Sequence, residues 1–166
     1  MAFRNILAAI DGSPHGARAL AEAVELARAY NASLTVMTSV PDPSVWMVTG
    51  GAYGGQLNYE ALVAGGEREY SELLEHAVEE VPDDLPVTKI ITHDPIRPAL
   101  MKEIKSGRHD LVVMGSRGRG AVASSVLGSV SHHALNHSPV PVLIVHAREP
   151  QAGTDEPNPA VAAHER

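Results

Sequence analysis

Five short apolar runs that alternate with stretches of helical periodicity constrain the fold of this chain most strongly. The runs occupy residues 5–10, 33–40, 86–92, 111–114 and 140–146. Between them, apolar residues recur at helical spacing over residues 14–30, 58–80, 95–106 and 129–137. Alternation of helices with strands that are apolar on both faces is typical of a parallel sheet covered by helices. The pattern predicts an α/β fold with an open five-stranded parallel sheet and helices on both faces.

The residues after the first run predict where the first helix begins. Asp11 and Gly12 form a turn sequence, Ser13 suits the N-cap position, and Pro14 suits the first helical position. Gly107 is a suitable stop for the third helix. Ligands of open parallel sheets bind beyond the carboxyl ends of the strands, which is where Asp11 is expected to lie.

A glycine-rich loop follows the fourth run and leads into the last helix. It contains Gly115, Gly118 and Gly128, followed directly by Ser129. Glycine lets a ligand approach the main chain, and a helix start offers unpaired N–H groups to a phosphate. Residues 111–147 contain no Asp or Glu, and their only Lys or Arg residues are Arg117 and Arg119, although the whole chain has a net charge of −7. The loop is therefore expected to hold a nucleotide polyphosphate, the alternative being a turn that collects glycine for geometric reasons alone.

The spacing Gly-x2-Gly-x9-Gly-Ser resembles the nucleotide-binding pattern of the universal stress protein family. The resemblance extends over residues 3–146, from Ile-Asp-Gly-Ser at 10–13 to Pro-Val-Pro-Val-Leu-Ile-Val at 139–145. Neither the P-loop pattern nor the dinucleotide-binding pattern is present. The resemblance implies a Rossmann-like sheet of the adenine nucleotide alpha hydrolase type, with strand order 3-2-1-4-5, that binds ATP and forms a homodimer.

The family's binding positions can be transferred to this chain one by one. Asp11 would accept hydrogen bonds from the ribose hydroxyls, although it also fits a plain turn. Val40 would meet the adenine edge through its main chain, and Met114 would pack on the base or simply fill the core. The expected binding residues are Ile10, Asp11, Val40, Met114, Gly115, Arg117, Gly118, Gly128, Ser129 and Val130. His93 departs from the family, which usually carries glycine there, and would either narrow the crevice or remain a surface residue.

The function implied is an ATP-binding module that regulates a stress response, with any Mg²⁺ carried by the nucleotide. Phosphoryl transfer needs a positioned attacking group, and no catalytic set or metal-ligand set is visible in the sequence. Two alternatives stay open: an enzyme that slowly hydrolyses ATP or transfers a phosphoryl or adenylyl group, and a dimeric module for AMP or cyclic AMP.

Composition and the remaining segments add further expectations. The acidic balance and an aromatic content of 4% argue against nucleic-acid binding. Zero cysteines and the lack of a long apolar run predict a cytoplasmic protein that does not cross a membrane. Residues 1–147 are expected to form one domain and residues 148–166 a disordered tail. The 41–57 loop would place Trp46 and Tyr53 as a lid or against the body. The apolar strand at 140–146 would form the dimer edge, the alternative being that the tail covers it.

Overall fold

A computed structural model describes residues 2–42, 59–119 and 127–147 of the chain. In chain order the elements are β1 (Asn5–Ala9), α1 (Pro14–Tyr30), β2 (Ser33–Ser39), α3 (Tyr59–Glu79), β3 (Val87–Thr92), α4 (Ile96–Lys105), β4 (Leu111–Gly115), α5 (Ser129–His137) and β5 (Val142–Val145). The expectations for Trp46, Tyr53 and the tail at 148–166 concern residues outside these ranges. The alternation predicted from the sequence is confirmed, and the element ends differ from it by only a few residues.

The five described strands form one parallel sheet in the order β3-β2-β1-β4-β5. In the register of the central pair, Ile6 lies opposite Leu111 and Ala9 lies opposite Met114. The order that the family resemblance implied is therefore confirmed. It makes β1 and β4 neighbours at the centre, so the turns at their carboxyl ends lie next to each other.

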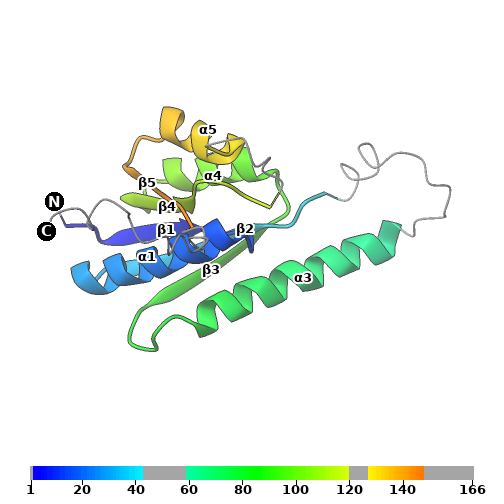
Figure 1. Cartoon of the computed structure of the whole chain (residues 1–166), viewed down its shortest axis with the longest axis horizontal. Coiled ribbons are helices and arrows are strands. Elements are labelled where there is room, and N and C mark those ends of the chain that lie inside the picture. Colours follow the sequence, from blue (N-terminus) through cyan, green and yellow to red (C-terminus); the bar gives the residue numbers. More distant parts are fainter. Residues whose placement is uncertain (1, 43–58, 120–126, 148–166) are drawn as a thin grey trace, which may run out of the picture.

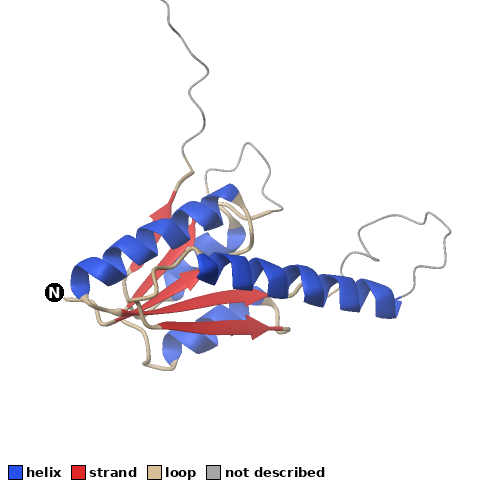
Figure 2. Cartoon of the chain, turned by 90° about the horizontal axis from the view of Figure 1, so that it is seen from below, coloured by secondary structure: helices blue, strands red, loops and turns tan. Residues whose placement is uncertain are grey.

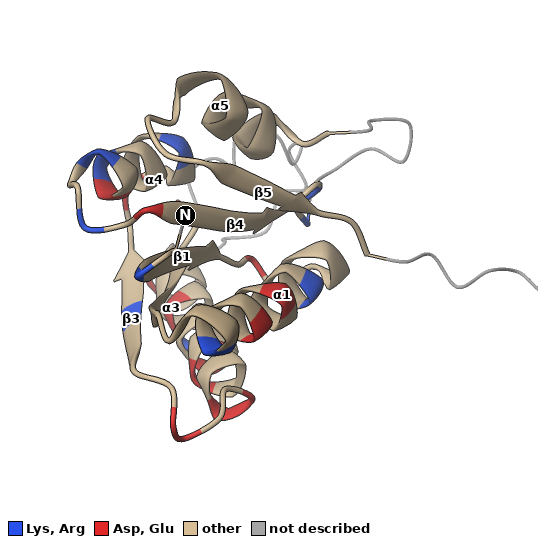
Figure 3. Ribbon diagram, turned by 90° about the vertical axis from the view of Figure 1, so that its left-hand side faces the viewer, with Lys and Arg blue, Asp and Glu red and all other residues tan. Residues whose placement is uncertain are grey.

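Helices cover both faces of the sheet, α1 and α3 on one face and α4 and α5 on the other (Figures 1 and 2). The side chains of a strand alternate between faces, so Ile6 and Ala8 of β1 join the core under α1 while Leu7 joins the core under α4. Acidic residues predominate on α3, residues of both charges occur on α1, and Lys and Arg predominate on α4 (Figure 3). Within the described ranges, no helix is both long and apolar enough to cross a membrane.

The last strand is shorter than the sequence suggested. It covers Val142–Val145 instead of 140–146. Pro141 has no amide hydrogen to donate to a ladder, although its carbonyl still accepts a hydrogen bond of 3.0 Å from the amide of Val112. The described part of β5 pairs with β4 alone, which leaves its other side as a sheet edge.

The core under α4 offers a direct test of the packing. Ile104 has 1% of its surface exposed and belongs to the same buried cluster as Leu7 and Val112. Replacing it with alanine removes three carbon atoms and leaves a cavity, so Ile104→Ala should lower the free energy of unfolding by about 2–5 kcal/mol in urea titrations. Lys102→Ala, at an exposed position of the same helix, is the control and should change stability by less than about 0.5 kcal/mol. Equal effects of the two substitutions would contradict the described packing of α4.

Candidate functional site

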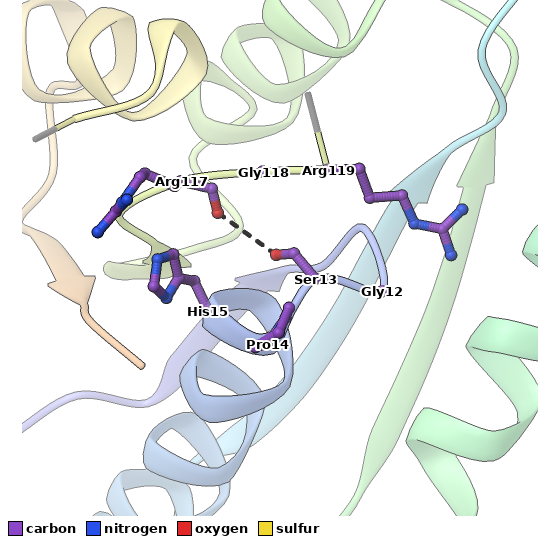
Figure 4. A pocket seen from close by; sticks show the side chains of 7 residues that line it. All are labelled: Gly12, Ser13, Pro14, His15, Arg117, Gly118 and Arg119. Atoms are coloured by element: carbon purple, nitrogen blue, oxygen red, sulfur yellow. Dashed lines mark hydrogen bonds between the residues drawn. The ribbon is translucent and has the colours of Figure 1, made fainter. Parts of the chain in front are cut away.

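The candidate site lies where two turns meet at the carboxyl ends of β1 and β4 (Figure 4). One turn joins β1 to α1, and the other begins the glycine loop after β4. An open pocket of about 350 Å³ lies between them. It is lined by Gly12, Ser13, Pro14, His15, Arg117, Gly118 and Arg119. The structure thus brings together Arg117 and Gly118 of the predicted set, in a pocket of the size that small ligands occupy.

The carboxylate of Asp11 ties the two turns together. Its Oδ1 accepts hydrogen bonds from the amide and the hydroxyl of Ser13, at 3.0 and 2.6 Å. Its Oδ2 accepts a hydrogen bond of 2.9 Å from the amide of Arg119, in the glycine loop. The carboxylate thus lies at the carboxyl end of the sheet, as expected, and meets the glycine loop at Gly118 and Arg119. An ionised carboxylate has about four acceptor positions, and the hydrogen bonds among the described residues use three of them.

Ser13 has two roles that its N-cap position predicts only in part. As expected for an N-cap, its Oγ accepts a hydrogen bond of 3.1 Å from the amide of Gly16 in the first turn of α1. The same oxygen lies within hydrogen-bond distance of Asp11 and, at 3.3 Å, of the Arg117 carbonyl (Figure 4). Since Ser13 is 5% exposed, its hydroxyl is a buried hydrogen-bonding contact between α1 and the glycine loop.

At two glycines of the motif, Gly118 and Gly115, atoms of other residues occupy the space that a side chain would need. A Cβ on Gly118 would lie 2.5 Å from Oδ2 of Asp11. A Cβ on Gly115 would lie 2.8 Å from the backbone carbon of His15 and 3.0 Å from the Gly16 amide nitrogen. Gly115 therefore lets the start of α1 pack directly on β4. Both glycines therefore have a packing role within the chain, which agrees with the geometric alternative offered by the sequence; their expected role in ligand approach stays a prediction.

Gly12 is required for a different reason. Its φ of +75° lies in the left-handed region, and a Cβ there would come within 2.4 Å of both Nη2 of Arg119 and Cδ1 of Leu73. The guanidinium of Arg119 therefore lies over the β1–α1 turn. It also forms an ion pair with Glu69 of α3, and its Cζ is 5.1 Å from the ring centroid of Tyr70.

The second part of the glycine motif forms the start of α5. The amide of Gly128 donates to the Ser116 carbonyl at 2.7 Å, which brings the helix start back to the loop. Gly128 is the N-cap and provides no side-chain capping bond. The first N–H groups of any helix have no partner within the helix itself. Ser129 is exposed there and Val130 is half-buried. The hydroxyl of Ser131, a contact that the sequence did not reveal, donates to the Gly115 carbonyl at 2.7 Å.

Three of the predicted residues are buried within the described structure. Ile10, Val40 and Met114 are 8%, 7% and 4% exposed. Ile10 belongs to the core under α1, and Met114 belongs to the core under α4. The Val40 amide donates to the Thr92 carbonyl at 2.9 Å, so only its carbonyl is left for an adenine edge.

His15 is a pocket residue that the sequence did not single out. Its Nδ1 accepts a hydrogen bond of 2.8 Å from the amide of Ala147, just beyond β5. An Nδ1 that accepts a hydrogen bond places the ring proton of a neutral histidine on Nε2. His15 therefore joins the pocket to the carboxyl end of the edge strand. No signal in the sequence could have found it, because 132 positions separate the two partners.

The other histidines in the described ranges do not line the pocket. His93 pairs with Glu67 of α3 at 2.6 Å on the surface, which agrees with the surface alternative. Across the described ranges, no group of three or more His, Cys, Asp or Glu side chains is arranged to hold a metal ion.

Comparison with known proteins shows the family. The model of the universal stress protein family matches residues 2–146. The chain belongs to the universal stress protein family.

Relatives among universal stress proteins differ in length. One from Thermus aquaticus is 34% identical over 152 residues, which cover 86% of this chain and 98% of the relative. One from Mycobacterium bovis is 34% identical over 139 residues, which cover 84% of this chain and 44% of the relative. The chain therefore spans less than half the length of the mycobacterial protein.

Solved universal stress protein structures share the fold. One from Arabidopsis thaliana with AMP bound has 18% identity and a TM-score of 0.62, covering 92% of this chain and 97% of its own. Another, in complex with cyclic AMP, has 24% identity and a TM-score of 0.56, covering 89% of this chain and 100% of its own. At this level of identity the likeness establishes the fold alone.

The close approach of Gly118 to Asp11 can be tested in this universal stress protein by adding a single methyl group. Gly118→Ala should lower the free energy of unfolding by about 1–3 kcal/mol, because the new Cβ overlaps Asp11 and forces the loop to shift. Gly65→Ala is the matched control, since a Cβ there meets nothing within 4 Å. Alanine is favoured over glycine within a helix, so this control should be neutral or stabilising by up to about 1 kcal/mol. If thermal or urea unfolding shows Gly118→Ala to be as stable as the control, the described contact is wrong.

Proposed function

We propose that this universal stress protein is a regulatory module that binds ATP in the pocket between the β1–α1 turn and the glycine loop. The observation that carries the proposal is the open pocket lined by Arg117 and Gly118. The Asp11 carboxylate, which binds the Arg119 amide, and the start of α5, whose Gly128 amide binds the Ser116 carbonyl, are both attached to the loop that forms this pocket. Amide groups and a guanidinium are the donors that phosphates favour, and a carboxylate is an acceptor for ribose hydroxyls.

The hydrogen bonds of Asp11 indicate how the ribose would enter. One of its roughly four acceptor positions stays open, whereas two ribose hydroxyls need two. Either the two hydroxyls share the open position, or the Arg119 amide gives up its bond to Oδ2. In the second case, binding of the ribose loosens the contact between Asp11 and the glycine loop. The Val40 carbonyl would then accept from the amino group of adenine, since its amide is already engaged with Thr92.

AMP and cyclic AMP are the alternative ligands for the same pocket. They are favoured by the two solved relatives described above, one with AMP bound and one in complex with cyclic AMP. ATP is preferred here because two arginines, Arg117 and Arg119, line the pocket, and a triphosphate tail has more oxygens for them to bind.

Binding without dedicated catalysis fits the described side chains better than turnover does. A general base for phosphoryl transfer must present an unengaged acceptor to the attacking group. Asp11 already accepts three hydrogen bonds, and Nδ1 of His15 is engaged with Ala147. Steady production of ADP from ATP by the purified protein, lost in Asp11→Asn, would favour the enzyme alternative.

The proposed regulatory work takes place in the cytoplasm and needs a homodimer, for which β5 supplies a surface. On this edge strand the side chain of Leu143 is 37% exposed. An apolar edge with unpaired amides is suited to pairing with a second copy across a twofold axis. The His15 bond to Ala147 would connect that edge to the nucleotide pocket.

The role of Arg117 can be measured by isothermal titration calorimetry with ATP and with AMP. Arg117→Gln should weaken ATP binding by about tenfold to a hundredfold, the loss expected for a hydrogen bond to a charged group. AMP should lose much less affinity, because it lacks the β- and γ-phosphates. Arg108→Gln, before the amino end of β4, is the control and should leave both affinities unchanged. Equal losses for ATP and AMP would show that Arg117 does not bind the triphosphate tail, and absence of ATP binding by the unaltered protein would overturn the proposed function.

The dimer edge can be tested with one charged substitution. Leu143→Lys should convert the dimer to a monomer in sedimentation velocity experiments, because a charge on the strand disfavours pairing of the two edges. Leu135→Lys, on the more exposed Leu135 of α5 (48%), is the matched control and should leave the dimer intact. A Leu143→Lys protein that sediments as a dimer would place the interface elsewhere.

A further inference from the structure

Arg119 holds the glycine loop against two other parts of the molecule. Its backbone amide donates to Asp11 at the end of β1, and its side chain crosses Gly12 to reach α3. There it forms the ion pair with Glu69 and lies over the ring of Tyr70. Arg117 and Arg119 point in opposite directions from the loop, and the side chain of Arg119 extends toward α3 (Figure 4). The loop is thus fastened by the backbone and by the side chain of the same residue.

The partner side chains on α3 suit this contact. Burial raises the pKa of the Tyr70 hydroxyl, and the positive charge of Arg119 opposes that rise. The ring is therefore uncharged at neutral pH and presents its face to the guanidinium. Glu69 is the charged partner, and its side chain is 59% exposed while that of Arg119 is 40% exposed. An exposed pair of this kind is weak, so a stronger anion can displace it.

Glu69 differs from Glu67 and Glu75 of α3 in its ion-pair partner. Glu67 pairs with His93, and Glu75 pairs with Lys89 of β3, so both attach α3 to the edge strand of the sheet. Among the described ion pairs of α3, the pair between Glu69 and Arg119 is the one that reaches the glycine loop. Loss of this pair would release the side chain of Arg119 from α3 while the other two pairs still hold α3 on the sheet.

We propose that Arg119 is a latch that sets the ligand preference of the pocket by phosphate charge: a polyphosphate takes its guanidinium from Glu69, whereas a ligand with a single phosphodiester charge does not. The inference rests on the proposed nucleotide site and names the residue that discriminates within it. Arg119 lines the same pocket as Arg117, so rotation of its side chain can bring the guanidinium to a ligand without unfolding the loop. Since attraction grows with the charge of the anion, ATP competes with Glu69 far better than cyclic AMP does.

Release of the latch also accounts for how the ribose gains access to Asp11. When the guanidinium leaves Glu69, the loop is free to shift and the Arg119 amide can give up Oδ2 of Asp11. A second acceptor position then becomes available to the ribose hydroxyls. Binding of the phosphates and binding of the ribose are therefore coupled through one residue, and both parts of ATP favour the same change.

The latch predicts a change in selectivity when Glu69 loses its charge. Glu69→Gln should strengthen ATP binding by about two- to fivefold, the value of an exposed ion pair that no longer has to be broken. The affinity for cyclic AMP, measured in the same way, should change by a smaller factor than the affinity for ATP. Glu75→Gln is the matched control, because it removes the same charge from the same helix but frees Lys89 instead. Its ratio of ATP to cyclic AMP affinity should equal that of the unaltered protein.

A double-mutant cycle separates the latch from a simple effect of removing negative charge near the pocket. Arg119→Gln should weaken ATP binding, and adding Glu69→Gln to that variant should have no further effect on the ratio of ATP to cyclic AMP affinity. If Glu69→Gln shifts the ratio equally with and without Arg119, or no more than Glu75→Gln does, the latch is wrong. In that result the unaltered protein still binds ATP, so the proposed function stands. If the unaltered protein binds neither ATP nor cyclic AMP, both the latch and the proposed function are wrong.

Discussion

The carboxylate of Asp11 is the interaction on which the geometry of the site depends. It fixes Ser13, which caps α1, and it fixes the amide of Arg119, which positions the glycine loop. The group is partly buried, and hydrogen bonds to an ionised acceptor are roughly twice as strong as those between neutral groups. The direction of α1 and the path of the loop are thus set by one side chain. The same side chain is the acceptor that we propose for the ribose, so ligand binding and the arrangement of the two turns would involve one group.

The glycines of the loop follow from this close arrangement. Gly115 lets α1 approach β4, Gly118 makes room for Asp11, and Gly12 makes room for the guanidinium of Arg119. Each missing side chain is replaced by protein atoms, which explains why the two turns can lie in contact at the centre of the sheet. The proposed phosphate site therefore lies at the rim of a loop whose interior is filled by protein atoms. At Gly115, Gly118 and Gly12 the glycine spacing is explained by packing within the chain.

Much of the fold could be predicted from local sequence, because apolar runs and cap residues act locally. Ser13 and Pro14 begin α1 as expected, and the strands lie within a few residues of the apolar runs. The strand order came from the family resemblance, since no local signal specifies which strands become neighbours. The pairing of Arg119 with Glu69 spans 50 positions, and the bond of His15 to Ala147 spans 132. Absence of acidic residues near the glycine motif in sequence gave no indication that α3 would bring Glu69 to the loop.

The loop also connects two regions of the molecule that are proposed to respond to the ligand. Arg119 joins it to α3, while the Ser116 amide donates to the Val145 carbonyl of β5 at 2.8 Å. His15 adds a second contact from the pocket to the end of β5 through Ala147. If ATP shifts the loop, the same shift acts on α3 and on the proposed dimer edge through bonded contacts. Coupling free energies between two binding events are reciprocal, so a dimer that forms more readily with ATP must also bind ATP more tightly, and by the same factor. Under this proposal, regulation needs no catalytic step, because the amount of bound ATP would determine how much of the protein pairs through β5.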